Sequence, residues 1–484
     1  MSFIPSRGRI PRVLLLFFLC ATLLISSTTW AGKVDAAKDT DLIQEVMDYI
    51  EAYNIEGVTR EDLIQAAIYG MVYSLDDPYT YYFTPEELKA FENELSATFV
   101  GVGISVLYNN KTVEVQYVYP NSPASEAGML AGDVITAING RTFADEEAYA
   151  NLISGKEGST VTLTVQRGEQ KQIFKMTRRE VKIDTVTSAV MDKNKGVGYI
   201  SLLQFAQDSD ELFEQHLDKL KQQGIHSLVL DLRDNPGGYI DTANNIAKQF
   251  IDKGLLMFTK DNSGKLEPFV ITDGKKNDLD IYILVNEGSA SASEVLSSAL
   301  QDQGYAKLIG MQTYGKARIQ SMISLSDGGM LKLTTESYVT PNKTDFNHIG
   351  IQPDVEVKGS LAQLITALKM AGVDQVTLHS STTGLKINGQ SFQDKLDYVV
   401  KGSKLYVSSR TLGALADASP AWSSSKKAVE FTTSTGKKAS FPTANQAAIL
   451  SDGITYVDVQ VFQQSFSGFT WSMKDKNITI TATN

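Results

Sequence analysis

Apolar residues recur at helical spacing near the start of the chain. Leu42, Val46 and Ile50 follow one another at intervals of four residues. This spacing predicts amphipathic helices, because positions three and four apart share one face of an α-helix. Thr84 and the proline after it are typical of a helix start, with threonine as the cap and proline at the first helical position. We therefore expect a helical region over residues 32–95.

Residues 96–182 show a different pattern, in which short alternations of apolar and polar positions are bordered by glycines. Val113, Val115 and Tyr117 alternate with polar residues. This period of two predicts a strand with one buried face. We expect a compact domain of short strands in this region.

Residues 183–358 alternate between apolar runs and helical patterns. The segments 198–202 and 227–232 read as strands, and the segment 210–222 reads as a helix. Another helix and the apolar run 281–285 follow. Strands that alternate with helices predict an α/β core.

The last hundred residues contain a weak tandem repeat. Its matching positions are Gly402, Tyr406, Trp422 and Val429 in one copy and Gly453, Tyr456, Trp471 and Ile478 in the other. Such an echo predicts repeated structural units. We expect a linker helix over residues 359–379 and a β-rich accessory domain over residues 380–484.

A length of 484 residues exceeds what one ordinary core holds and predicts three or four domains. Together with the patterns above, it predicts a multidomain α/β and β fold. The net charge of −11 argues against nucleic-acid partners, because nucleic-acid binding needs a basic face.

The N-terminus has the layout of a secretory signal peptide. Three arginines precede the apolar run 13–25, and small and polar residues follow it. We expect residues 1–31 to be removed and the protein to be secreted or extracytoplasmic, with an uncleaved membrane anchor as the alternative. Cys20, the only cysteine, lies inside this segment, so the mature chain would have no disulfide and no thiol nucleophile.

Ser291 follows the apolar run 281–285 in the sequence Gly-Ser-Ala-Ser-Ala-Ser-Glu. With Glu294 it fits a helix capping box, in which a serine merely satisfies backbone amides. The same place suits a nucleophile, because free amides and the positive end of a helix dipole favour a developing oxyanion. These residues alone leave both interpretations open.

Lys316 is the candidate base for that serine, because the chain has only four histidines. A lysine base must lose its charge, so its pKa must fall by about 3 units from about 10.4, which only burial provides. A solvated surface lysine is the alternative. Gln320 lies four positions further on, which is about 13 Å along a straight strand, so the spacing leaves its role open.

Gly237 follows the buried strand 227–232, in an Asn-Pro-Gly-Gly turn. The plain interpretation is a tight turn. The functional one is that glycine lets a substrate carbonyl approach a backbone amide. The amides of Gly237 and Ala292 would then form an oxyanion hole.

The block 96–182 resembles a PDZ domain. The motifs that carry this resemblance are Phe99-Val100-Gly101-Val102-Gly103-Ile104, Ser122-Pro123-Ala124 and Gly132-Asp133-Val134-Ile135. The resemblance implies a groove that captures a protein C-terminus by strand addition, with the carboxylate bound by amides of Gly101, Val102, Gly103 and Ile104.

From about Leu63 to Val357, the chain resembles the carboxy-terminal processing peptidases, or tail-specific proteases. The further matching motifs are the segment 67–75, Pro78-Tyr79, Asp231-Leu232-Arg233, Asn235, Gly237-Gly238, Val285-Asn286, Gly315-Lys316, Tyr338, Thr340-Pro341, Gly350-Ile351 and Pro353-Asp354. The resemblance implies a Ser291 nucleophile, a Lys316 base and a supporting Gln320. It also implies a core akin to the crotonase and Clp-protease folds, protein C-termini as substrates, and a homodimer.

Ala317 departs from this family's pattern, in which a second glycine follows the lysine. If that position needs a positive φ, alanine is unfavourable there. A catalytically degenerate PDZ scaffold or chaperone at the cell surface is therefore the alternative function. A trypsin-like protease with a PDZ domain fits less well, because no serine motif of that class is present.

The C-terminal repeat loosely resembles the N-terminal stalk repeats of copper amine oxidases. We expect it to bind cell-wall polymer, to form a dimer element or to brace the protease; core Trp and Tyr would favour bracing. We expect no cofactor and no metal site.

Overall fold

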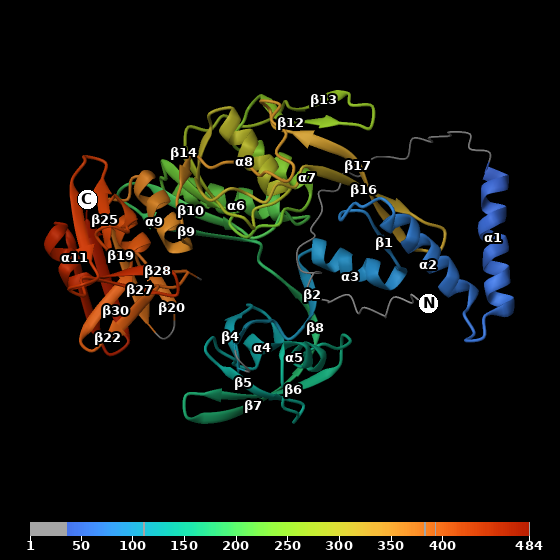
Figure 1. Cartoon of the computed structure of the whole chain (residues 1–484), viewed down its shortest axis with the longest axis horizontal. Helices are drawn as coiled ribbons and strands as arrows, with labels where there is room; N and C mark the ends of the chain where they lie inside the picture. Colours follow the sequence, from blue (N-terminus) through green and yellow to red (C-terminus); the bar gives the residue numbers. More distant parts are fainter. Residues whose placement is uncertain (1–35, 110–111, 382–383, 393, 484) are drawn as a thin grey trace.

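The computed structural model describes residues 36–109, 112–381, 384–392 and 394–483, so the expected signal peptide lies outside the described residues. The molecule is elongated, with the N-terminal helices at one end, an α/β core in the middle and a β-rich domain at the other end (Figure 1). A small β domain projects from the side of this row. Within the described residues, no helix is both long and apolar enough to cross a membrane.

The N-terminal region is mainly helical, as expected. Its elements are α1 (Ala36–Tyr53), α2 (Arg60–Tyr73), β1 (Tyr81–Phe83) and α3 (Pro85–Leu95). The predicted start of α3 is formed, because Thr84 Oγ1 accepts the backbone N–H of Glu87 and the Glu87 carboxylate accepts that of Thr84. The apolar stripe of α1 is largely exposed, with Leu42 at 64% and Val46 at 49%.

The short strand β1 interrupts the predicted helical stretch. It pairs antiparallel with β17 (Met330–Val339) of the core, with Tyr81 opposite Lys332 and Phe83 opposite Met330. A strand of three residues gives no periodicity in the sequence, so its partner far along the chain specifies it. This pairing fastens the N-terminal region to the core.

The projecting domain is a five-stranded sheet in the order β3-β4-β5-β6-β7, and β2 and β8 form the two-stranded neck that carries it (Figure 1). Its elements are β2 (Thr98–Gly101), β3 (Ile104–Asn109), β4 (Thr112–Val118), α4 (Pro123–Glu126), β5 (Val134–Ile138), α5 (Glu146–Ile153), β6 (Thr160–Arg167), β7 (Gln170–Thr177) and β8 (Arg179–Lys182). Val113 and Val115 are fully buried, as the alternation predicted. The prediction was wrong for Tyr117, which is 41% exposed, because a bulge in the pairing with β3 shifts the alternation after Val115.

The α/β core is built on a six-stranded sheet in the order β18-β15-β14-β11-β10-β9, parallel except for β9. A second sheet joins β13, β12, β17 and β1, with β16 paired to β17. The elements are β9 (Val186–Asp192), β10 (Val197–Leu202), α6 (Ser209–Gln222), β11 (Ser227–Asp231), α7 (Ile240–Ala247), β12 (Gly254–Lys260), β13 (Leu266–Ile271), β14 (Asp280–Val285), α8 (Ala292–Asp302), β15 (Ala306–Gly310), β16 (Arg318–Ser324), β17, β18 (Val355–Glu356) and α9 (Ser360–Met370).

Both faces of the six-stranded sheet are buried, as a parallel sheet requires. Leu228 and Leu230 of β11 pack in the hydrophobic core formed with α6, α7 and α8. Val229, between them, packs on the other side with α9 and the β-rich domain. The catalytic core and the C-terminal domain therefore share one hydrophobic layer.

The C-terminal domain repeats a hairpin, a helix and a second hairpin. Its elements are β19 (Gln375–Ser381), β20 (Gly384–Ile387), β21 (Gln390–Phe392), β22 (Tyr398–Lys401), β23 (Lys404–Ser408), α10 (Ser409–Leu415), β24 (Ala418–Ser423), β25 (Ala428–Thr433), β26 (Lys438–Pro442), β27 (Ala448–Ser451), β28 (Ile454–Asp458), α11 (Val459–Ser465), β29 (Phe469–Lys474) and β30 (Asn477–Thr483). The matching positions of the tandem repeat lie on equivalent elements of the two units. Gly402 and Gly453 lie in the turn of the first hairpin of each unit, and Tyr406 and Tyr456 lie on the second strand of that hairpin, β23 and β28.

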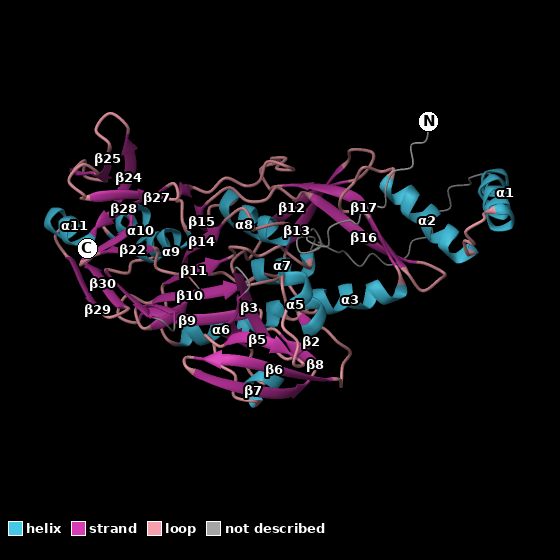
Figure 2. Ribbon diagram, turned by 60° about the horizontal axis from the view of Figure 1, so that its bottom comes forward, coloured by secondary structure: helices cyan, strands magenta, loops and turns pink. Residues whose placement is uncertain are grey.

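The two repeat units meet through β23 and β28, which pair antiparallel with Val407 opposite Val457. Figure 2 shows this domain packed against the end of the core that carries α9. β19 already pairs with β30 of the C-terminal sheet, so the linker helix ends at Met370 and the domain begins before residue 380.

Candidate active site

Ser291 lies where the polypeptide leaves β14 and enters α8. The residue is fully buried, and its backbone has φ +55° and ψ −116°. Such a conformation is costly for a residue other than glycine and persists only where the surroundings impose it. Within the described chain, its Oγ has no hydrogen-bond partner. A buried hydroxyl without a partner is unusual in a purely structural serine.

Glu294 holds the backbone around both predicted catalytic residues. One carboxylate oxygen accepts the N–H groups of Ser291 at 2.9 Å and Lys316 at 2.8 Å. The other accepts the Gly315 N–H at 2.6 Å and the Thr313 hydroxyl at 2.5 Å. The side chain is fully buried, and burial raises the pKa of Glu294 while these four donors act in the opposite direction. Two segments far apart in sequence are thus fixed to one side chain.

Lys316 is buried, with 3% of its surface exposed, rather than solvated. Its Nζ lies 5.0 Å from the centre of the Tyr79 ring, which comes from the N-terminal region just before β1. Its carbonyl oxygen accepts the hydroxyl of Tyr338, a fully enclosed side chain whose pKa burial raises well above its ordinary value. The Tyr79 ring therefore covers the amine of Lys316, and the Tyr338 hydroxyl holds its backbone.

The change from glycine to Ala317 does not strain this loop. The positive φ, +89°, belongs to Gly315, where an added Cβ would lie 2.8 Å from the backbone nitrogen of Gly350. Ala317 is absent from the residues with positive φ and packs fully buried in the core with Ile319. The condition under which alanine would be unfavourable is therefore not met.

Gln320 lies on β16, next to a bulge between Ile319 and Gln320 in the pairing with β17. It is fully buried, which excludes a plain surface role. Its Nε2 donates to Thr334 Oγ1 at 3.3 Å, and within the described residues its Oε1 accepts no hydrogen bond.

Gly237 packs directly against the Ser291 turn. A Cβ at this position would lie 2.8 Å from Ser291 Cβ and 2.9 Å from the Ala292 nitrogen, so only glycine fits. The backbone of Gly237 therefore lies close to the Ala292 nitrogen. The Gly237 N–H donates to Asn235 Oδ1 at 2.9 Å in this conformation, so an incoming oxyanion would have to replace or share that bond.

The predicted carboxylate-binding loop joins β2 to β3. Val102 is buried, and Gly103 has φ +80°, with no room for a Cβ because Ser122 Cβ would lie 2.1 Å away. β3 is an edge strand that pairs only with β4 among the described strands. Its outer edge is therefore open to a further strand.

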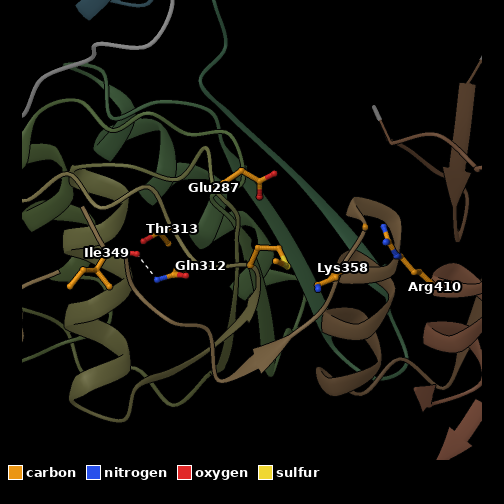
Figure 3. A pocket seen from close by; sticks show the side chains of 8 residues that line it. Glu287, Gln312, Thr313, Ile349, Lys358 and Arg410 are labelled. Atoms are coloured by element: carbon orange, nitrogen blue, oxygen red, sulfur yellow. Dashed lines mark hydrogen bonds between the residues drawn. The ribbon is translucent and has the colours of Figure 1, made fainter. Parts of the chain in front are cut away.

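A pocket of about 510 Å³ lies where the loops after β14 and β15 meet the start of α9 and α10 (Figure 3). Its lining residues are Glu287, Met311, Gln312, Thr313, Ile349, Lys358, Gly359 and Arg410. Figure 3 shows Gln312 bonded to the Ile349 carbonyl, with Lys358 and Arg410 on the opposite side. Since Thr313 also contacts Glu294, this pocket borders the loop that carries Lys316.

Sequence reasoning missed three residues that shape the site: Glu294, Tyr79 and Tyr338. Glu294 gave a signal, the capping-box spacing, but that spacing points to a helix cap rather than to a link with Lys316. The two tyrosines lie within segments used for the family resemblance, and nothing in their spacing assigns them to Lys316.

Three family models match the chain. Residues 196–357 match peptidase family S41, residues 114–167 match a PDZ domain, and residues 25–87 match the N-terminal domain of the activating protease CtpB. These matches confirm the predicted PDZ domain and peptidase core. No comparison confirms the resemblance of the C-terminal repeat to copper amine oxidase stalks, which stays a prediction.

The chain is also similar to whole proteins. A probable CtpA-like serine protease of Staphylococcus aureus is 34% identical over 388 residues, which cover 76% of this chain and 77% of that protein. A probable CtpA-like serine protease of Staphylococcus saprophyticus is 32% identical over 379 residues, with 76% and 77% covered. Among solved structures, the photosystem II D1 C-terminal processing protease is 28% identical with a TM-score of 0.46, covering 70% of this chain and 98% of its own.

Proposed function

Since the chain belongs to peptidase family S41 and is a serine-type C-terminal processing peptidase, we propose that Ser291 is its nucleophile and Lys316 its general base. Ser291 Oγ attacks the carbonyl carbon of the scissile peptide bond, and Lys316 Nζ takes the hydroxyl proton. The same nitrogen then gives that proton to the leaving amine. Water hydrolyses the resulting ester and restores both groups.

One observation carries this proposal: the Glu294 carboxylate ties the amides of Ser291 and Lys316 to a single oxygen in a buried site. Burial disfavours an ammonium, as a lysine base requires. Catalytic hydrogen bonds commonly tighten only when substrate is bound.

The amides of Gly237 and Ala292 are the proposed oxyanion donors. Of the N–H groups in the first turn of α8, those of Ser293, Glu294 and Val295 donate to backbone carbonyls. Ala292 stands at the positive end of the same helix. Loss of one such donor typically lowers kcat by about 10²–10³-fold.

The test is cleavage of an unfolded protein with an apolar C-terminal tail, followed by mass spectrometry of the products. Ser291→Ala and Lys316→Ala should each lower turnover by at least about 10³-fold, because each removes one half of the acyl-transfer pair. Thermal unfolding of both variants serves as the folding control. Undiminished cleavage by either folded variant would refute the assignment.

We further propose that the PDZ domain selects substrates by their C-terminal tails. The support is the open edge of β3 beside the loop from Gly101 to Ile104, which suits strand addition with the terminal carboxylate on backbone amides.

Secretion is proposed from the N-terminal layout of basic, apolar and small residues. Terminal sequencing of the mature protein checks it: a chain that begins near residue 32 supports cleavage, and one that retains residues 1–31 contradicts it.

A homodimer is proposed from the exposed apolar stripe of α1 and α2, in which Val46, Tyr49 and Met71 are each about half exposed or more. Val46→Glu should shift the mass measured by light scattering from dimer to monomer. A wild-type chain that is monomeric at high concentration excludes this dimer.

Cell-wall contact is proposed for the C-terminal domain because Trp422 is 44% exposed. Sedimentation of the full chain with peptidoglycan tests it, with Trp422→Ala as the comparison. Tyr406 and Tyr456 are buried in the domain core, which supports bracing as a further role.

A further inference from the structure

Arg233 joins the loop that carries Gly237 to the C-terminal domain. Its guanidinium donates from Nε and Nη2 to both carboxylate oxygens of Asp231, at 2.8 and 2.6 Å. Nη2 also lies 3.4 Å from Asp394 Oδ2, in the C-terminal domain. Nη1 donates to the carbonyl and hydroxyl oxygens of Ser360, the first residue of α9, at 2.7 and 2.6 Å. One side chain therefore bonds to three parts of the molecule.

The network is enclosed and leaves little freedom. The side chains of Arg233, Asp231 and Asp394 are 7%, 7% and 8% exposed. Tyr199 of β10 donates its hydroxyl to Asp231 at 2.8 Å, and its ring packs edge-on against Phe392, two residues before Asp394. A planar guanidinium between two carboxylates accepts few orientations, so it fixes the backbone that carries it.

That backbone runs directly into the proposed oxyanion loop. Asn235 follows two residues later, and its carbonyl accepts the Ala290 N–H at 3.0 Å and the Ser293 hydroxyl at 2.9 Å. These two donors flank Ser291. Gly237 then packs on Ser291 itself. A shift at Arg233 is therefore transmitted to the distance between the Gly237 amide and the nucleophile.

We infer that Asp394 is a positioning residue of the peptidase: through Arg233, the C-terminal domain sets the place of the Gly237 amide relative to Ser291. This inference rests on the proposed role of Gly237 in the reaction. Asp394 touches neither substrate nor reacting atoms. Its effect belongs to the chemical step, because a displacement of about 1 Å in a catalytic group can cost about 10²-fold in rate.

The test compares Asp394→Asn with a matched variant, Asp417→Asn, in the full chain. Asp417 forms an ion pair with Lys369 of α9 at 2.5 Å. Each of the two substitutions therefore removes one carboxylate of the C-terminal domain that is paired with a basic residue outside that domain. Asp417 has φ +49°, which asparagine tolerates. Among the described residues, Asp417 is paired with Lys369 and forms no hydrogen bond or ion pair with residues 233–238.

Initial rates with fluorescently labelled casein, an unfolded protein, give kcat and KM. Asp394→Asn should lower kcat about tenfold with KM within about twofold, while Asp417→Asn keeps the wild-type kcat. Asp394→Glu, which restores the charge, should recover part of the loss. A wild-type kcat in Asp394→Asn, or an equal loss of kcat in Asp417→Asn, overturns the inference.

Two further variants distinguish a failure of the proposed function from a failure of the positioning role. Ser291→Ala with undiminished casein cleavage would overturn the proposed function itself, whereas an inactive Ser291→Ala beside a fully active Asp394→Asn overturns only the positioning role. If Asp394→Asn does not fold, Ser360→Ala removes the hydroxyl between Arg233 and Asp394 and keeps both charges. Its kcat should fall by a smaller factor at unchanged KM, and a wild-type kcat contradicts the inference.

Discussion

Glu294 is the side chain on which the active-site geometry depends most. Its two oxygens accept four donors from the Ser291 turn and from the loop of residues 313–316. Charge-assisted bonds of this kind are stronger than bonds between neutral groups. Because the site is buried, a substitution that removes one of these acceptor oxygens lowers the stability of the fold, since each buried donor left without an acceptor costs free energy.

Glu294→Gln should therefore impair both stability and activity. The amide –NH₂ replaces one oxygen and faces donors instead of accepting from them, which leaves two donors unsatisfied. We expect the free energy of unfolding to fall by about 2–4 kcal/mol and kcat by at least about 10²-fold. Chemical denaturation and casein cleavage measure the two effects. Wild-type kinetics in a folded variant would show that the carboxylate does not set the geometry.

Gly237→Ala tests the close approach of the Gly237 loop to Ser291, the proposed nucleophile. The new Cβ would lie 2.8 Å from Ser291 Cβ, and φ is +103°. We expect kcat to fall by at least about 10²-fold, because Ser291 or the Gly237 amide must move.

Gly372→Ala is the control for Gly237→Ala. Gly372 has φ +107° but no atom within 4 Å of an added Cβ, so the variant carries similar backbone strain without a clash. It should lose stability and keep its kcat. Equal kcat losses in the two variants would assign the effect to backbone strain alone.

Residue types singled out side chains that are buried together, but not the bonds that connect them. Ser291 and Lys316 are both buried and share one carboxylate, which spacing alone could not establish. A positive φ was considered for the residue after Lys316, but it occurs at Gly315, the residue before it. The packing of this loop against Gly350 sets that conformation, and the sequence does not reveal it. The Asn235 bond to the Gly237 amide has no counterpart in any sequence pattern.

At the level of elements, periodicity predicted the core well. The strands at 198–202 and 227–232 and the helix at 210–222 correspond to β10, β11 and α6, which are long enough to show a period. The sequence did not predict β1 or the pairing of β19 with β30. Both depend on strands far away in the chain rather than on the composition of the segments themselves.

The open edge of β3 supports a prediction about ligand chemistry. A fluorescent peptide with an apolar C-terminus should bind the full-length Ser291→Ala chain, and amidation of its terminal carboxylate should weaken binding at least about tenfold. Fluorescence anisotropy measures both affinities. Equal affinity for acid and amide would exclude carboxylate capture by the loop from Gly101 to Ile104.

At the level of the whole molecule, the C-terminal domain covers one face of the catalytic sheet. Val229, Leu284 and Ile309 of that sheet share a core with α9 and with the two repeat units. An uncovered face of this size would be an apolar patch in water. The domain is thus part of the fold of the peptidase rather than a separate module.

A chain that ends after Asp374 should therefore be far less soluble and unfold at a lower temperature than the full chain. A chain that begins at residue 60 is the control, because it removes α1, whose apolar side chains are already exposed. Soluble yield and thermal unfolding check both. A soluble truncated chain with the wild-type unfolding temperature would contradict a shared core.

The pairing of β1 with β17 has a consequence for biosynthesis. Tyr79 lies beside the Lys316 amine, and the adjoining strand β1 is paired to residues 330–332. A ribosome makes the tyrosine long before it makes the strand that seats it. The contact between Tyr79 and Lys316 can therefore form only after most of the α/β core has left the ribosome, so the N-terminal region cannot complete its packing on the core during early synthesis.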